Sequence, residues 1–213
     1  MPEITGLRER RGRVWVSVDG EPFAEIASEV MLDRGLYEGL SISEEELDGV
    51  RVAGERSLAM TRAFDYLAYR ARSAGEVRGR LYRYGYGDRT IEEVLARLEE
   101  LGYVDDREFA RTVARERGGK YGPRRVYSDL LKGGVSEELA DAAVEEEFSG
   151  RSEVEEARSA ALRRYNTGQG SDAESRRVYG FLARRGYSAG VCAEIAREFR
   201  VDGDLRASEE ADT

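Results

Sequence analysis

The chain has 213 residues, with 34 basic and 43 acidic side chains, so its net charge at pH 7 is −9. It contains no histidine and one cysteine, Cys192, which excludes Ser-His-Asp and Cys-His triads, His-ligated zinc, a Cys₄ metal site and an internal disulfide. No run of 18 apolar residues occurs, and the first residues do not resemble a secretory signal. We therefore expect a cytoplasmic protein with no membrane contact, no metal and no other cofactor.

The charge is unevenly distributed along the chain. Residues 1–55 carry a net charge of −7, residues 56–132 a net charge of +5, and residues 133–213 a net charge of −7. Electrostatic attraction is screened over about 8–10 Å, so it follows the local charge. The basic middle can therefore attract phosphates or an acidic protein surface although the whole chain is acidic.

Residues 1–27 have the pattern of β structure. Val14, Val16 and Val18 recur at every second position, and Asp19-Gly20 separates them from a second extended run. Asp-Gly between two such runs favours a hairpin, because both central residues of its turn need a positive φ. Trp15 on this hairpin is expected either to pack on the helices that follow or to anchor an interface.

The rest of the chain is predicted to be helical. Ser28 is expected to cap a short helix that Gly35 ends, and Ser43 with Glu46 forms a capping box for a helix that runs toward Val52. Further helices are predicted at about 56–71, between Ser73 and Gly85, between Thr90 and Gly102, and over 106–117, 123–132, 137–147, 152–166, 174–185 and 189–199. Residues 201–213 are polar and acidic and are predicted to be disordered.

These helices group in threes. A leucine stands four residues before a glycine at the end of each second helix, in the pairs Leu81/Gly85, Leu130/Gly134 and Leu182/Gly186. A capped third helix follows each glycine, starting at Thr90, Ser136 and Ser188. The glycines are 49 and 52 residues apart, and a period near 50 indicates a tandem helical repeat, although leucine and glycine also end helices in other amphipathic helical proteins.

The expected fold is mostly α-helical: three tandem three-helix repeats in an elongated, curved body, preceded by a small N-terminal β-hairpin region. The predicted boundaries are 1–55 for the N-terminal region, 56–104, 105–150 and 151–200 for the three repeats, and 201–213 for the tail.

Several segments resemble one bacterial family. They are Arg70–Val77 with Leu81, Gly85 and Ile91–Leu98, then Gly102–Ala110, then Gly122 with the basic helix after it, and Phe181–Ser188. This ordered set, over residues 58–199, resembles the RecX regulatory proteins. The resemblance implies a protein that binds the RecA recombinase within the groove of its filament on single-stranded DNA, and we expect this protein to be a monomer. It also implies that the protein restrains the ATPase and strand exchange of RecA, in DNA repair, recombination and the SOS response, with no catalysis of its own.

Two basic surfaces are candidates for contact with the partner or with DNA. Arginine binds phosphate and carboxylate groups bidentately, and tyrosine can stack on a base. The candidate residues are Arg78, Arg80, Arg83, Arg107, Arg111, Arg115, Lys120, Tyr121, Arg124 and Arg125. The alternatives are a solvated helix face for the second helical repeat and, for the first, arginines whose stems cover packed tyrosines.

Two other functions remain open at this point. The three-helix units could form an independent DNA-binding module of the helix-turn-helix kind, although the third helices are acidic, as at Glu92-Glu93 and Glu145–Glu147. An enzyme that uses carboxylates would need converging acids, which the spacing does not require.

Asp105-Asp106 is interpreted as a helix N-cap, and Cys192 as a core thiol.

Overall fold

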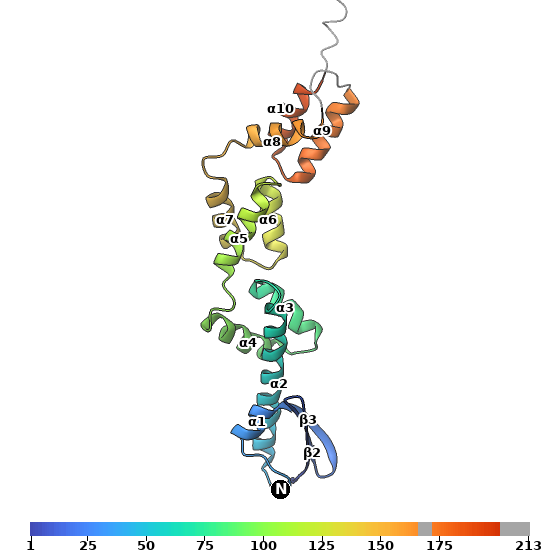
Figure 1. The fold of residues 1–213 in the computed structure, drawn as a ribbon, viewed down its shortest axis with the longest axis vertical. Helices are drawn as coiled ribbons and strands as arrows, with labels where there is room; N and C mark the ends of the chain where they lie inside the picture. The colour runs from blue at the N-terminus through green and yellow to red at the C-terminus, as the bar shows by residue number, and fades with distance from the viewer. Residues whose placement is uncertain (166–171, 201–213) are drawn as a thin grey trace, which may run out of the picture. The chain divides into compact units, whose positions relative to one another are not determined.

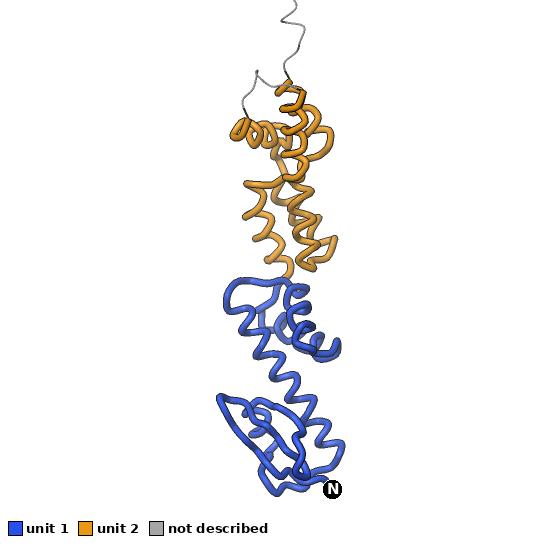
Figure 2. Tube along the Cα trace, turned by 90° about the vertical axis from the view of Figure 1, so that its right-hand side faces the viewer, with its two compact units in different colours: residues 1–105 blue, residues 106–213 orange. Residues whose placement is uncertain are grey.

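The computed structural model describes residues 1–165 and 172–200. The chain forms two compact units, residues 1–105 and residues 106–213 (Figure 2). The tail at 201–213, predicted to be disordered, lies outside the described residues, as does the last residue of the helix predicted at 152–166.

The first unit begins with a three-stranded antiparallel sheet. Its strands, in the order β1-β2-β3, are β1 (Ile4–Arg10), β2 (Arg13–Val18) and β3 (Glu21–Ala27). The hairpin predicted at Asp19-Gly20 is confirmed, because both residues have a positive φ, of 52° and 85°. A second turn of this kind, at Arg11-Gly12, joins β1 to β2 with φ of 52° and 76°. That turn was not predicted, since arginine is uncommon at positive φ.

One face of the sheet packs on two helices, α1 (Ser28–Asp33) and α2 (Glu44–Leu67), and α2 runs beside β3 (Figure 1). Val14, Val16 and Ile26 are buried on this face, in a cluster that includes Leu47 and Val50 of α2. Alternate residues of β2 therefore point to the helices, and the residues between them point away.

Helix α2 continues well beyond its predicted end. The capping box of Ser43 and Glu46 is confirmed, but the predicted end near Val52 is wrong, since one helix extends to Leu67. A Cβ at Gly54 would lie 2.3 Å from the side chain of Ile26, so the glycine is needed where α2 crosses the sheet. The apolar pattern that would indicate one continuous helix is interrupted within α2. The first half of α2 packs on the sheet, and the second half packs in the next hydrophobic cluster, around Ala59.

The cap predicted for α1 is also wrong by one residue. Ala27 is the N-cap and makes no side-chain capping bond, while the Ser28 hydroxyl donates to a carboxylate oxygen of Glu9 at 2.7 Å. Gly35, with φ of 59°, follows the end of this helix as predicted.

The remaining helices form three groups of three. The first group contains the second half of α2 with α3 (Ala74–Arg83) and α4 (Asp88–Glu100). The second contains α5 (Asp106–Gly118), α6 (Pro123–Lys132) and α7 (Glu137–Phe148), and the third α8 (Glu153–Leu162), α9 (Asp172–Arg185) and α10 (Ala189–Glu198). Each group encloses its own hydrophobic cluster, which confirms the mostly helical fold of three-helix groups. Cys192 is fully buried in the third cluster, as predicted.

No helix in the described part of the chain has both the length and the apolar character needed to cross a bilayer.

The same turn ends the second helix of every group. Gly85, Gly134 and Gly186 have φ of 88°, 78° and 87°, the left-handed conformation that ends a helix in a Schellman motif. The residue after each glycine donates its N–H to the carbonyl of the buried leucine five positions earlier. These bonds are Tyr86 to Leu81 at 3.4 Å, Val135 to Leu130 at 3.2 Å and Tyr187 to Leu182 at 3.2 Å. The spacing that marked the repeat in the sequence is therefore the spacing of this motif.

The N-cap of each third helix lies two residues after its glycine. Ser136 and Ser188 are N-caps whose side chains accept backbone N–H groups, as predicted. Thr90 is not a cap: Gly87 is the N-cap of α4, and the Thr90 hydroxyl donates to a carboxylate oxygen of Glu55 at 2.9 Å. The three caps are thus at equivalent positions, and Thr90 instead ties α4 to α2.

Within the second unit, the start of α6 and the end of α9 satisfy each other's backbone groups. Gly122, the N-cap of α6, donates its N–H to the carbonyl of Arg185 at 2.8 Å, and Arg124 donates its N–H to the carbonyl of Gly186 at 3.2 Å. Free donors at a helix start and free acceptors at a helix end are both costly to bury unpaired. The opposite partial charges of the two helix ends also attract each other.

This junction makes Gly186 more sensitive to substitution than other left-handed glycines. A Cβ at Gly186 would lie 2.3 Å from the backbone nitrogen of Arg125, whereas one at Gly150, with φ of 72°, would meet open space. We expect Gly150→Ala to cost about 1 kcal/mol through its backbone conformation, and Gly186→Ala to cost about 3 kcal/mol or more. Urea unfolding followed by helical circular dichroism measures both, and equal costs would contradict the junction.

Candidate partner interface

The basic residues of α3 are partly used within the first unit. The guanidinium group of Arg78 pairs with the carboxylate of Glu92 on α4, with Nη2 2.9 Å from Oε1. Arg83 is exposed and donates to the carbonyl of Gly79, one turn earlier, at 3.2 Å. Arg83 therefore has donors left for a partner, whereas the charge of Arg78 is balanced within the fold.

Arg80 lies inside a stack of arginines and tyrosines. Its guanidinium carbon is 5.5 Å from the ring centre of Tyr66 and 4.9 Å from that of Tyr84. Arg72 covers Tyr66 at 4.1 Å, and Arg62 covers Tyr84 at 5.0 Å, so cations and rings alternate from α2 to α3. This arrangement matches the alternative of arginine stems packed on tyrosines, here Tyr66 and Tyr84.

The predicted contact residues on α5 divide into exposed and paired residues. Arg107 and Arg115 are exposed, and within residues 1–165 and 172–200 neither forms an ion pair. Arg111, between them, is half-buried, and its Nε lies 3.0 Å from a carboxylate oxygen of Glu146 on α7. The two outer arginines are thus available, while the middle one helps to hold α5 against α7.

Arginines of α5 and α6 flank one largely buried carboxylate. The side chain of Asp129 on α6 is 10% exposed and pairs with both Arg117 and Arg125. Arg125 also lies 5.9 Å from the ring centre of Tyr121, which packs against the second hydrophobic cluster. The side chain of Lys120 is exposed and has no ion pair in the described part of the chain.

Arg124 and Arg125 line a hollow at the junction of α6 and α9, which we call the α6–α9 hollow. It has a volume of about 460 Å³, and α9 contributes Arg184 and Tyr179 to its wall. Arg124 and Arg184 are exposed, and no carboxylate of the described residues lies within ion-pair distance of either. The hollow thus combines two uncompensated guanidinium groups with a tyrosine ring that is 40% exposed. Such a surface can bind phosphate or carboxylate groups next to a planar ring.

Arg184 and Tyr179 were not among the predicted site residues. They are about 60 residues from Arg124, and only the backbone junction between α6 and α9 brings them together. The available signal was the pair Arg184-Arg185 directly before a helix-ending glycine, which marks a basic helix end.

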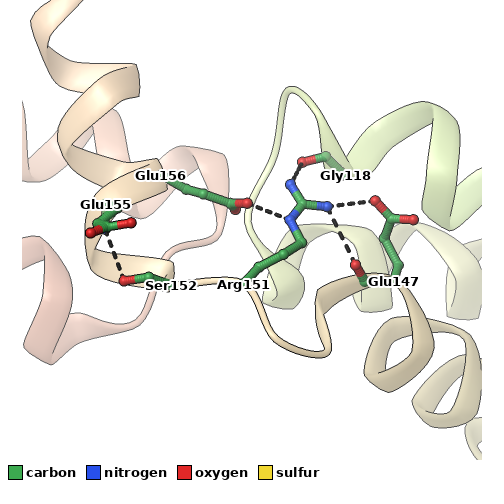
Figure 3. A network of polar contacts seen from close by, with 6 residues as sticks. All are labelled: Gly118, Glu147, Arg151, Ser152, Glu155 and Glu156. Atoms are coloured by element: carbon green, nitrogen blue, oxygen red, sulfur yellow. Dashed lines mark hydrogen bonds and ion pairs between the residues drawn. The ribbon is translucent and has the colours of Figure 1, made fainter.

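Arg151 joins the second and third helix groups (Figure 3). It donates to the carbonyl of Gly118 at 3.0 Å, at the end of α5, and pairs with Glu147 of α7 and Glu156 of α8. Burial opposes the charge of Arg151, but its hydrogen bonds and charge pairing with the two carboxylates outweigh burial and raise its pKa. One side chain between α7 and α8 thus joins three helices.

Comparison with known proteins identifies the family. Residues 59–98 match the family model "RecX, first three-helix domain", and residues 105–144 match "RecX, second three-helix domain". The regulatory protein RecX of Thermus thermophilus is 35% identical over 148 residues, which cover 70% of this chain and 96% of that protein. The chain belongs to the RecX family.

Other RecX proteins match over different lengths. The RecX protein of Bacillus licheniformis is 27% identical over 99% of this chain and 82% of its own length. The RecX protein of Lactobacillus johnsonii is 32% identical over 65% of this chain, but the match covers only 53% of that longer relative.

Two solved RecX structures share the fold. A crystal structure of regulatory protein RecX aligns with a TM-score of 0.66 and 24% identity over 93% of this chain and 100% of that chain. The crystal structure of RecX from Lactobacillus salivarius aligns with a TM-score of 0.58 and 23% identity, over 72% of this chain and 99% of that chain.

The Arg151 network predicts a stability effect larger than that of a surface ion pair. Arg151→Ala leaves the Gly118 carbonyl and two half-buried carboxylates without their donor, so we expect a loss of about 1–3 kcal/mol. Arg97→Ala removes an exposed pair with Glu100 and should change stability by less than about 0.5 kcal/mol. Urea unfolding of both variants checks this prediction, and it would be wrong if the two losses were equal.

Proposed function

We propose that this protein binds the filament of the RecA recombinase and inhibits its ATPase and strand-exchange activities, with no catalysis of its own. Membership of the RecX family carries this proposal. The proposed setting is DNA repair, recombination and the SOS response in the cytoplasm. The protein acts as a monomer, and it meets single-stranded DNA through the filament.

The basic residues that lack partners within the fold support a contact of this kind. The predicted contact set contains four exposed residues with no ion pair among the described residues of the second unit: Arg107, Arg115, Lys120 and Arg124. We add Arg184, because it lines the α6–α9 hollow. In the first unit, Arg83 is the α3 arginine that has hydrogen-bond donors left for a partner. These cationic side chains would bind acidic side chains of the recombinase or DNA phosphates.

The inhibition that we propose is mechanical. Each three-helix group has its own hydrophobic cluster, so it keeps its shape while it contacts a separate part of the filament. Protein that bridges neighbouring recombinase subunits would hinder the movement that accompanies ATP turnover. The Arg151 network and the α6–α9 junction would help the second unit to resist this movement.

An independent DNA-binding module is disfavoured by the surfaces of the third helices. Glu92, Glu99 and Glu100 of α4 are exposed, and so are Glu145 and Glu146 of α7. Of these, Glu99 and Glu145 form no ion pair among the described residues, so their negative charge is uncompensated. Carboxylates on a helix repel the phosphates that line the major groove. Binding to naked duplex DNA, without RecA, that is as tight as binding to the RecA filament would favour this alternative.

The test measures ATP hydrolysis and strand exchange by RecA on single-stranded DNA in the presence of this protein. Wild-type protein should inhibit ATP hydrolysis and strand exchange, and the double variant Arg124→Glu/Arg184→Glu should raise the half-inhibitory concentration by about tenfold, because it reverses two contact charges. The matched control, Arg176→Glu/Arg177→Glu, makes the same charge change at the other end of α9 and should stay within about twofold of wild type. Unchanged ATP hydrolysis and strand exchange at saturating wild-type protein would refute the proposed function. Equal effects of the two double variants would refute the assignment of the surface.

A further inference from the structure

The outer face of the N-terminal sheet carries the only tryptophan of the chain. The inward residues of β2 are buried against α1 and α2, whereas Trp15, which lies between them, points to the opposite face and is 41% exposed. An indole group is the largest apolar side chain, and leaving it in water forfeits a large burial energy. The function proposed above does not use this residue.

Basic residues are concentrated around this tryptophan. The first 55 residues hold six basic side chains, and four of them are Arg8, Arg10, Arg11 and Arg13. This first hairpin is therefore a positive region within a segment whose net charge is −7. In the register of the sheet, Arg8 is directly opposite Trp15.

The face around Trp15 is an open hollow of about 950 Å³. Its wall includes Arg8, Arg10, Phe23, Glu25 and Glu38. The two carboxylates already have partners: Glu25 pairs with Arg13 at 2.9 Å, and Glu38 accepts the backbone N–H of Leu7 at 2.9 Å. In the described part of the chain, no carboxylate lies within ion-pair distance of Arg8 or Arg10. Because a backbone N–H is neutral, Glu38 keeps its negative charge, and Arg8 and Arg10 against this one carboxylate leave the hollow with a net positive charge.

We propose that this face binds a single strand of nucleic acid, with a base stacked on Trp15 and phosphates held by Arg8 and Arg10. The two arginines are two residues apart on one strand and face the same side, so their Cα atoms are about 7 Å apart. That distance suits consecutive phosphates of an extended strand. Stacking on an indole requires an unpaired base, whose ring face a duplex hides. An acidic peptide could pair with the arginines but would supply no ring for the indole.

This site lies outside the segments that match the three-helix family models, and it needs no RecA. Its test can therefore fail while the proposed inhibition of RecA stands, and the reverse also holds.

Trp15 is itself the reporter for the experiment. We expect oligothymidylate, added to the full-length chain, to quench the tryptophan fluorescence saturably and more weakly as salt rises. For single strands, the logarithm of the affinity falls by about 0.7 per neutralised phosphate for each unit of log salt. The double variant Arg8→Ala/Arg10→Ala should bind about tenfold or more weaker and should reduce the salt slope by about 1.4.

The control is the double variant Arg34→Ala/Arg51→Ala. It removes the other two basic residues of the first 55, which lie beside α1 and on α2, and should bind like wild type. Trp15→Ala, followed by the anisotropy of a labelled oligonucleotide, should bind about tenfold or more weaker, with the circular dichroism spectrum unchanged.

Three results would overturn the proposal: no quenching by oligothymidylate, equal quenching by a duplex, or displacement of the oligonucleotide by polyglutamate at equal charge concentration. An equal loss of affinity in the Arg34/Arg51 control would also overturn it.

Discussion

The left-handed glycine at the end of each second helix is the constraint on which the three-helix groups depend. At Gly85, Gly134 and Gly186 the chain reverses its course, so that a leucine buried in the core also accepts the backbone N–H that follows the glycine. One turn thus fixes where the second helix ends, which side chain enters the core and where the third helix begins. A residue with a Cβ would be strained at each of these positions.

The separate clusters explain how one chain can offer several independent surfaces. Each three-helix group is filled by its own apolar residues, and the sheet has a fourth cluster that shares α2 with the first group. Because the helices bury their apolar stripes within a group, their charged residues remain at the surface. Some of these, such as Arg80 and Arg111, stabilise the fold, and others, such as Arg124 and Arg184, remain available to a partner.

Local patterns in the sequence predicted most of the fold but only part of the site. The Asp19-Gly20 turn, the glycine-ended helices and the serine caps depend on neighbouring residues, and so they could be predicted. The continuity of α2 could not, because Gly54 is required by contact with Ile26 on a distant strand. The α6–α9 hollow and the Arg151 network also join residues tens of positions apart, and no spacing rule brings such residues together.

Backbone hydrogen exchange in the free protein tests the repeated turn most directly. The amides of Tyr86, Val135 and Tyr187 donate to the three leucine carbonyls, although all three lie beyond the end of their helices. We expect each to exchange at least about a hundredfold more slowly than an unstructured peptide, because the bond opens only when the helix group opens. Exchange of any of the three at the rate of an unstructured peptide would contradict the shared turn, and with it the three-fold construction of the helical region.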